Sequence, residues 1–201
     1  MKVYFSPASP FVRKVLVAAH ELGLSDRIER LACAAHPINR DMDIVAHNPL
    51  GQVPTFFTDD GRVLYDSRVI CEYLDSLGQG RLFGSGDVRW HALTEQSLAD
   101  GLLDAALLAR YETAVRPEAL RWDAWTRSQL DKVNSALDHL EKSVAQFGDR
   151  VDIGTITTAC GLGYLDFRFP DLGWRTSRPQ LARWFTEFEK RPAMKATSPR
   201  A

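Results

Sequence analysis

The chain lacks the features that mark several large classes of protein. Among its 201 residues no apolar run approaches the roughly 20 that a membrane-spanning helix needs. The first residues hold no apolar stretch long enough for a secretion signal. The 25 basic and 26 acidic residues give a net charge of −1, so the basic excess typical of nucleic-acid-binding proteins is missing. We therefore expect a cytoplasmic protein that binds neither membranes nor nucleic acids.

Cysteine is scarce as well. Cys33, Cys71 and Cys160 are odd in number and widely spaced, and they form neither a CxxC pair nor a zinc-ligand pattern. The sequence therefore predicts reduced thiols and no metal site. What remains is an ordinary globular composition, 45% hydrophobic and 25% charged, without repeats or low-complexity segments. This length and composition allow one or two domains.

The first 78 residues alternate strand and helix signals. Serine and aspartate are favoured helix N-caps, and proline suits the first helical position, so helices are expected to begin after Ser9-Pro10 and Asp66-Ser67. The turn residues Asp59-Asp60-Gly61 lie between two apolar runs and predict a hairpin. This order predicts an α/β domain over residues 1–78. Its expected strands are 3–5, 28–32, 53–57 and 63–65.

The rest of the chain reads as a linker and an all-helical domain. Residues 79–86 are rich in glycine and predict the linker. Residues 87–201 carry apolar residues at helical spacing and predict the second domain. The first of its helices is expected to bury one long face formed by Trp90, Leu93, Ser97, Leu98, Gly101, Leu102, Ala105 and Leu108. Three further faces are expected over Leu130–Val144, Ile153–Phe167 and Leu181–Phe188.

Ser9 is a candidate for stabilising an anion. A helix N-terminus presents unpaired N–H groups and about half a positive charge, which suits a thiolate. Lowering a thiol pKa by two units requires about 2.7 kcal/mol. A hydrogen bond to a charged acceptor supplies about 1.5–3 kcal/mol and the helix terminus about 0.3–2, so one serine is sufficient. The alternative is a purely structural cap.

Two other segments can likewise be interpreted either as ligand-binding or as purely structural. If the Val53-Pro54 peptide bond is cis, the Val53 backbone can pair with a peptide-like ligand, although only about 5–6% of X–Pro bonds in folded proteins are cis. Asp66 and Ser67 offer a carboxylate, a hydroxyl and free N–H groups, which together suit an amino-acid head group. Taken singly, each segment is more often structural: proline usually occupies an edge position of a strand, and Asp66-Ser67 usually serves as a helix cap.

Taken together, these segments resemble the glutathione S-transferase family, in particular its bacterial serine-type members. Residues 4–15 (Tyr-Phe-Ser-Pro-Ala-Ser-Pro-Phe-Val-Arg-Lys-Val) are similar to the N-terminus of these enzymes. Residues 48–54 (Asn-Pro-Leu-Gly-Gln-Val-Pro) and 65–70 (Tyr-Asp-Ser-Arg-Val-Ile) are similar to two further family motifs, and residues 162–168 and 191–194 to its C-terminal signatures. The resemblance spans nearly the whole chain.

The resemblance implies a thioredoxin-like N-terminal domain, a helical C-terminal domain and a homodimer. It also implies a cis Val53-Pro54 bond, which reverses the expectation from base rates. Ser9 would donate a hydrogen bond to the glutathione sulfur, and the Val53 backbone would pair with the cysteinyl part of glutathione. The residues expected at the γ-glutamyl end are Gln52, Asp66 and Ser67. His36 and Arg40 are candidates for the glycyl carboxylate.

Other assignments by family analogy are less specific. Asp100 resembles an acidic residue that reaches the partner's glutathione across the dimer, and a solvated helix face is the alternative. The electrophile pocket would be built from Phe11, Leu107, Tyr111 and Tyr164, which are equally compatible with core positions. Tyr4 and Ser6 compete with Ser9 for the sulfur. Cys33 is either a redox residue or an idle thiol.

The sequence departs from the family in two informative places. Residues 152–155 (Asp-Ile-Gly-Thr) replace the usual Ser/Thr-x-x-Asp cap; we expect Thr155 to be a poorer reciprocal partner and Gly154 to cost about 1 kcal/mol of helix propensity. Position 9 is serine rather than cysteine, which removes the nucleophile for disulfide exchange. The expected activity is conjugation of glutathione to an apolar electrophile. The alternatives are a non-catalytic binding or regulatory protein and a glutathione-dependent peroxidase or lyase.

Overall fold

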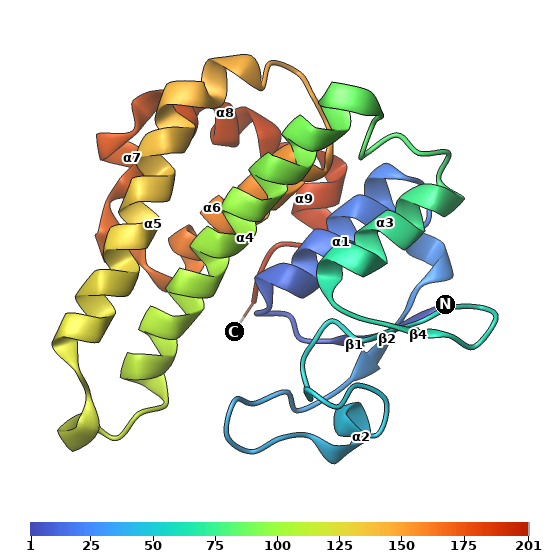
Figure 1. Cartoon of the computed structure of the whole chain (residues 1–201), viewed down its shortest axis with the longest axis horizontal. Coiled ribbons are helices and arrows are strands. Elements are labelled where there is room, and N and C mark those ends of the chain that lie inside the picture. The colour runs from blue at the N-terminus through green and yellow to red at the C-terminus, as the bar shows by residue number, and fades with distance from the viewer. Residues whose placement is uncertain (201) are drawn as a thin grey trace. The chain divides into compact units, whose positions relative to one another are not determined.

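The computed structural model describes residues 1–200, and these form two compact units. One unit spans Met1–Gly86 together with the segment that begins at Pro192, and the other spans Asp87–Arg191 (Figure 1). The division near residue 86 lies at the end of the glycine-rich segment expected as a linker. The C-terminal segment differs from the expectation for residues 87–201, because it packs with the first unit rather than the second.

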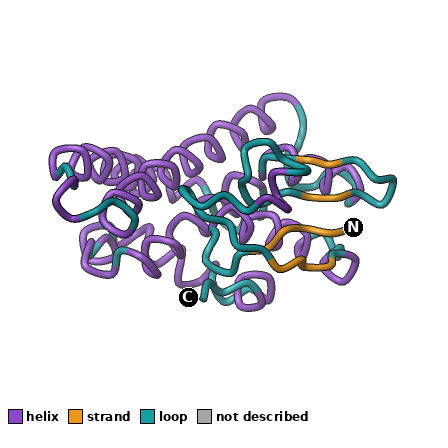
Figure 2. Tube along the Cα trace, turned by 90° about the horizontal axis from the view of Figure 1, so that it is seen from below, coloured by secondary structure: helices purple, strands orange, loops and turns teal. Residues whose placement is uncertain are grey.

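The first unit contains a four-stranded mixed sheet with the strand order β2-β1-β3-β4. Strand β1 pairs in parallel with β2 and antiparallel with β3, and β3 pairs antiparallel with β4. The strands are drawn in orange in Figure 2. All the predicted strands are present, although β3 and β4 are only two residues long. The strands are β1 (Lys2–Phe5), β2 (Glu29–Ala32), β3 (Phe56–Phe57) and β4 (Val63–Leu64).

Helix α1 packs against both α3 and α9 in this unit. The core between sheet and helices is fully buried at Val3, Val15, Phe56 and Leu74. Arg13 on α1 donates from Nη2 to the carbonyl oxygen of Met194 at 3.2 Å, which fixes the C-terminal helix to the sheet unit. The helices are α1 (Pro10–Glu21), α2 (Met42–Val45), α3 (Ser67–Leu77) and α9 (Pro192–Ala196), with a 3₁₀ turn at Ser25–Arg27.

The second unit is all-helical, and α6 is its centre, since every residue from Ile153 to Leu165 is buried. This mixed sheet unit followed by a helical unit confirms the predicted fold class. The helices are α4 (Gly86–Ala114), α5 (Asp123–Ser143), α6 (Ile153–Arg168), α7 (Trp174–Ser177) and α8 (Pro179–Phe188). Three 3₁₀ turns join them, at Glu118–Leu120, Val144–Gln146 and Pro170–Leu172.

The predicted buried face of α4 is wrong over most of its length. Leu102 and Ala105 are buried as expected, but Trp90 is 66% exposed and Leu108 is 44% exposed. A Cβ added at Gly161 of α6 would lie 4.0 Å from the carbonyl oxygen of Ala99, so the two helix backbones approach closely. Small residues of α4 are therefore buried beside Leu102 and Leu103, whereas hydrophobic periodicity singled out large residues along the whole helix. The buried small residues of α4 are Ala92, Ala99, Ala105, Ala106 and Ala109.

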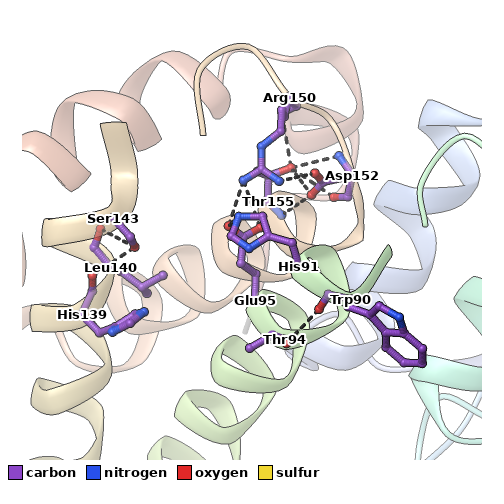
Figure 3. A network of polar contacts seen from close by, with 10 residues as sticks. All are labelled: Trp90, His91, Thr94, Glu95, His139, Leu140, Ser143, Arg150, Asp152 and Thr155. Atoms are coloured by element: carbon purple, nitrogen blue, oxygen red, sulfur yellow. Dashed lines mark hydrogen bonds and ion pairs between the residues drawn. The ribbon is translucent and has the colours of Figure 1, made fainter. Parts of the chain in front are cut away.

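The start of α6 also differs from the expectation. Thr155 N–H donates to Asp152 Oδ1 at 2.9 Å and Asp152 N–H donates to Thr155 Oγ1 at 3.0 Å, so both halves of a capping box are present. The expected poor reciprocal contact is therefore wrong. A Cβ at Gly154 would lie 2.5 Å from Glu95 Oε2 and 3.1 Å from the carbonyl oxygen of Ala92. Glycine thus permits close packing on α4, which offsets its low helix propensity. Figure 3 shows the capping-box residues Asp152 and Thr155 beside Glu95.

Candidate functional site

The register of the sheet brings two of the predicted segments together. Val3 of β1 pairs with Phe56 of β3, and Tyr4 N–H donates to the carbonyl oxygen of Thr55 at 2.9 Å. Because the strands are antiparallel, the residues before Thr55 run alongside the residues that follow β1. The segment Val53-Pro54 therefore lies beside the carboxyl end of β1, from which the chain continues to Ser9.

The third predicted segment, Asp66-Ser67, lies at the same edge of the sheet. Phe56 of β3 also pairs with Leu64 of β4, so β4 ends where β3 begins. Asp66 and Ser67 follow directly and open α3. Since α1 packs against α3, the N-termini of both helices, which carry partial positive charge, lie at this edge of the sheet. We call this edge the helix-start edge; it consists of Ser9, Val53, Pro54, Asp66 and Ser67.

Ser9 is the N-cap of α1. Its Oγ accepts a hydrogen bond from Val12 N–H at 3.2 Å, and the residue is half-buried. A serine hydroxyl can donate its proton while its oxygen accepts a bond. The capping role and donation to an anion are therefore compatible, and the two interpretations of Ser9 do not exclude each other.

Asp66 is the N-cap of α3 and accepts a hydrogen bond from Arg68 N–H through Oδ1 at 2.9 Å. Its side chain is exposed, whereas Ser67 is only 2% exposed. The Val53-Pro54 peptide bond is cis, as the family resemblance implied, and the Tyr65-Asp66 bond is cis as well. Both cis bonds lie at the helix-start edge.

Two buried side chains for which the sequence predicted no role, those of Asn48 and Thr55, hold the loop before β3. Asn48 is 1% exposed and donates from Nδ2 to Thr55 Oγ1 at 2.9 Å and to the carbonyl oxygen of Gln52 at 3.3 Å. Thr55, fully buried, donates from Oγ1 to that same carbonyl at 2.7 Å. Asn48 and Thr55 thus fix the backbone on both sides of Val53. Asn48 opens the family motif of residues 48–54, and its Asn-Pro dipeptide is also a turn signal, but neither assigns it these partners.

His36 and Arg40 occupy the loop between β2 and α2. His36 is exposed, and its Nδ1 accepts hydrogen bonds from Ile38 N–H at 3.2 Å and Asn39 N–H at 3.0 Å. Arg40 donates from Nη2 to the carbonyl oxygen of Pro49. Arg40 therefore tethers the loop that leads to Gln52, and its role toward a ligand stays a prediction, as does that of His36.

The competing candidates for the sulfur have other partners. Tyr4 donates through its hydroxyl to the carbonyl oxygen of Asp43 on α2 at 3.3 Å, and burial, followed by the Asp43 charge, raises its pKa. The carbonyl oxygen of Ser6 accepts a hydrogen bond from Ser9 N–H at 3.1 Å. Tyr4 thus contacts α2 rather than the start of α1, which favours Ser9 over Tyr4 for the sulfur.

Cys33 follows β2 at the helix-start edge. Its Sγ donates to the carbonyl oxygen of Phe5 at 3.4 Å, and the side chain is half-buried. Burial is the largest cause of a raised pKa at this thiol. A raised pKa favours the protonated form, which is the less reactive one.

The remaining predicted residues belong mostly to the second unit. Asp100 on α4 is only 1% exposed, so the alternative of a solvated helix face is wrong. Its reach to a partner subunit stays a prediction. Tyr164 on α6 is 4% exposed, and burial raises its pKa to about 12. Leu107 is half-buried and Tyr111 is 39% exposed on α4, while Phe11, half-buried on α1, belongs to the first unit.

Residues 1–200 contain no group of three or more histidine, cysteine, aspartate or glutamate side chains arranged to hold a metal ion. Within the same residues, no helix combines the length and the apolar character needed to cross a membrane.

Comparison with known proteins identifies similar sequences and structures. Residues 8–77 match the family described as the glutathione S-transferase N-terminal domain, and residues 123–187 match the corresponding C-terminal domain. The chain is 33% identical over 207 residues to the GST-like protein YibF of Escherichia coli K12, covering 99% of this chain and 98% of YibF. It is also 33% identical over 196 residues to the glutathione S-transferase GstB of the same organism, covering 92% and 90% of the two chains.

A solved structure is similar over the full length. A glutathione transferase family member from Pseudomonas fluorescens Pf-5, crystallised with bound glutathione, superposes with a TM-score of 0.96 at 45% sequence identity. The match covers 100% of this chain and 99% of that one.

Proposed function

The chain belongs to the glutathione S-transferase family, and we propose that it is an enzyme that ionises glutathione at Ser9 and joins the thiolate to an electrophile. The observation that carries the proposal is the helix-start edge, where a capping serine, the Val53 backbone and the Asp66-Ser67 helix start converge. The bound glutathione in the Pseudomonas fluorescens relative supports glutathione as the co-substrate.

Each element of this edge has a part in the proposed binding. The backbone of Val53, fixed through Asn48 and Thr55, pairs with the cysteinyl part of glutathione as an added strand would. Asp66 receives the γ-glutamyl ammonium, and the N-terminus of α3 receives the neighbouring carboxylate. Gln52, which is exposed beside Val53, is a further contact for the γ-glutamyl end.

The chemical step needs no covalent intermediate on the protein. Ser9 donates a hydrogen bond to the sulfur, and the start of α1 adds positive potential, so the thiol proton leaves to solvent at neutral pH. The thiolate then forms a bond from sulfur to the electrophilic carbon. Where the acceptor is an aryl chloride, the carbon–chlorine bond breaks and chloride departs with the electron pair. Holding both reactants together supplies the rest of the acceleration. We propose that the apolar acceptor contacts Leu107, Tyr111 and Tyr164 of the second unit, and that the enzyme is a homodimer.

The test is a titration of the protein with reduced glutathione that follows the ultraviolet absorbance of the thiolate at neutral pH. We expect saturable binding with a thiolate signal in the unchanged protein. Ser9→Gly should abolish that signal while leaving binding largely intact, because glycine still tolerates the N-cap position and lacks only the hydroxyl. Ser9→Ala should do the same, with an added loss of about 1 kcal/mol in the free energy of unfolding.

Two control variants separate the competing residues. Tyr4→Phe and Ser6→Ala should each retain the thiolate signal. If Ser6→Ala abolishes it and Ser9→Gly does not, the assignment of Ser9 is wrong. Saturable binding without any thiolate would instead support a non-catalytic binding protein. A peroxidase or lyase would show the thiolate but turn over peroxides or ethers rather than conjugate an electrophile.

A further inference from the structure

Two half-buried arginines in the second unit, Arg110 on α4 and Arg168 on α6, have no carboxylate partner within residues 1–200. Other half-buried arginines of this unit do have one: Arg150 binds Glu95, Arg175 binds Asp166 and Arg178 binds Asp138, each with a nitrogen-to-oxygen distance of 2.7–2.8 Å. Arg168 stacks on the ring of Phe167, with its Cζ 3.9 Å from the ring centroid, but this contact does not neutralise its charge. A guanidinium partly removed from water without a counter-ion is costly, so two such arginines at half-buried positions favour the binding of an anion.

The packing of α4 and α6 places these two arginines near each other. A Cβ at Gly154 would lie 3.1 Å from the carbonyl oxygen of Ala92, and a Cβ at Gly161 would lie 4.0 Å from that of Ala99. Moving seven residues along α6, from 154 to 161, corresponds to moving seven residues along α4, from 92 to 99. The two helices are therefore parallel and keep the same register over this stretch. One further step of seven brings Arg168 beside residue 106 of α4. Side chains lean toward the N-terminus of their helix, so Arg110 covers the turn that begins at residue 106.

The electrostatics agree with this placement. Burial, followed by the positive charge of Arg110, lowers the pKa of Arg168, so the two guanidinium groups are near enough to repel each other. The nearest acids in sequence are engaged elsewhere. Glu112 accepts from Arg116 Nε and from Trp122 N–H, both at 2.8 Å, and Asp166 accepts from Arg175 Nη2 at 2.7 Å.

Aromatic side chains accompany the pair. Tyr111 follows Arg110 directly, and Tyr164 lies one turn before Arg168 on the same side of α6. Both tyrosines are in the acceptor pocket of the proposed function, so the arginines adjoin that pocket. An apolar wall with two cationic groups fits a molecule whose body is apolar and which carries one acidic group.

We infer that Arg110 and Arg168 form an anion-binding pair that selects acceptors bearing a carboxylate or a comparable acidic group. The inference rests on the proposed function, because it names the class of electrophile that the same site takes. The guanidinium groups bind the acidic group and take no part in forming the carbon–sulfur bond. Their expected effect is therefore on acceptor recognition and not on thiolate formation.

The test compares two aryl chlorides that differ only in charge, 4-chloro-3-nitrobenzoate and 4-chloro-3-nitrobenzamide. Each kcat/KM is divided by the uncatalysed rate constant with glutathione, which removes the difference in intrinsic reactivity. We expect the unchanged protein to prefer the benzoate. Arg110→Gln and Arg168→Gln should each lower the benzoate value by about tenfold or more and leave the benzamide value nearly unchanged. Arg168→Lys should retain part of the preference, since it keeps the charge.

A matched control and a second readout keep the outcome decisive. Arg127→Gln, at an exposed position on α5, should leave kcat/KM unchanged for both substrates. Calorimetric titration with the two thioether products should show tighter binding of the acidic product, and the glutamine variants should remove that difference. Equal handling of the acid and the amide in both readouts overturns the inference while leaving the transferase proposal intact. A protein that binds neither product and forms no thiolate overturns both.

Discussion

Arg150 donates from Nη2 to both carboxylate oxygens of Glu95, at 2.8 and 3.1 Å. The same guanidinium donates from Nη1 to Asp152 Oδ2 at 2.8 Å, and Asp152 is the N-cap of α6. Glu95 belongs to α4, so this one side chain joins two helices and the loop that precedes α6 (Figure 3). Glu95 and Asp152 are 11% and 13% exposed, which removes most of the screening that weakens surface ion pairs.

Glu95→Gln should therefore destabilise the protein. The substitution leaves the Arg150 charge with one carboxylate instead of two, and we expect the free energy of unfolding to fall by about 1–3 kcal/mol. Urea denaturation followed by circular dichroism measures this change. Glu187→Gln is the control, because Glu187 pairs with Lys190 on the surface, where the two side chains are 67% and 60% exposed. Its effect should stay within about 0.5 kcal/mol, and equal losses in both variants would contradict the role of the network.

Gly154→Ala should destabilise the contact between α6 and α4. The added methyl group would lie 2.7 Å from Glu95 Cβ and 3.1 Å from a backbone oxygen that cannot rotate away, so we expect a loss of about 1–3 kcal/mol. Gly101→Ala offers a matched comparison, since nothing lies within 4 Å of a Cβ at that helical glycine. That variant should gain about 0.5–1 kcal/mol from helix propensity. Thermal unfolding of both variants gives the sign of each change.

Thr55→Val should weaken glutathione binding. It removes the hydroxyl that bonds the carbonyl oxygen of Gln52 and the Asn48 amide, and so loosens the backbone that presents Val53. We expect the Kd for glutathione to rise about fivefold, which corresponds to about 1 kcal/mol. Thr157→Val removes another fully buried hydroxyl, which donates to the carbonyl oxygen of Ile153 at 2.6 Å within α6. This control should alter stability but not the Kd.

The buried side chain of Tyr164 should make the folded protein less stable at high pH. Burial raises its pKa from 10.0 to about 12, so between these values the folded protein keeps a proton that the unfolded chain releases. The unfolded state binds fewer protons in that window, and stability falls as pH rises through it. The phenolate absorbance of the folded protein should show a component near pH 12 that Tyr164→Phe removes and Tyr65→Phe retains. A titration in which Tyr164→Phe changes only the component near pH 10 would contradict this account.

Local sequence signals were sufficient to predict many of the helix starts, strands and turns of this protein. The caps at Ser9, Asp66 and Asp152, the short strands and the hairpin turn are encoded by residues within a few positions of one another, and each lies where the sequence predicted it. Local patterns also predicted the α/β domain and the all-helical domain, and the family resemblance added the cis Val53-Pro54 bond; the fold class and the cis bond are confirmed.

Contacts between distant residues were decided by the tertiary structure alone. The buried face of α4 follows from the close approach of its backbone to α6, which buries several alanines beside Leu102 and Leu103 and leaves Trp90 and Leu108 exposed. The Asn48–Thr55 network and the Glu95–Arg150 contact depend on which elements pack together, as does the inferred placement of Arg110 beside Arg168. A sequence determines its local hydrogen bonds through neighbouring residues, whereas such contacts depend on the packing of whole helices and strands.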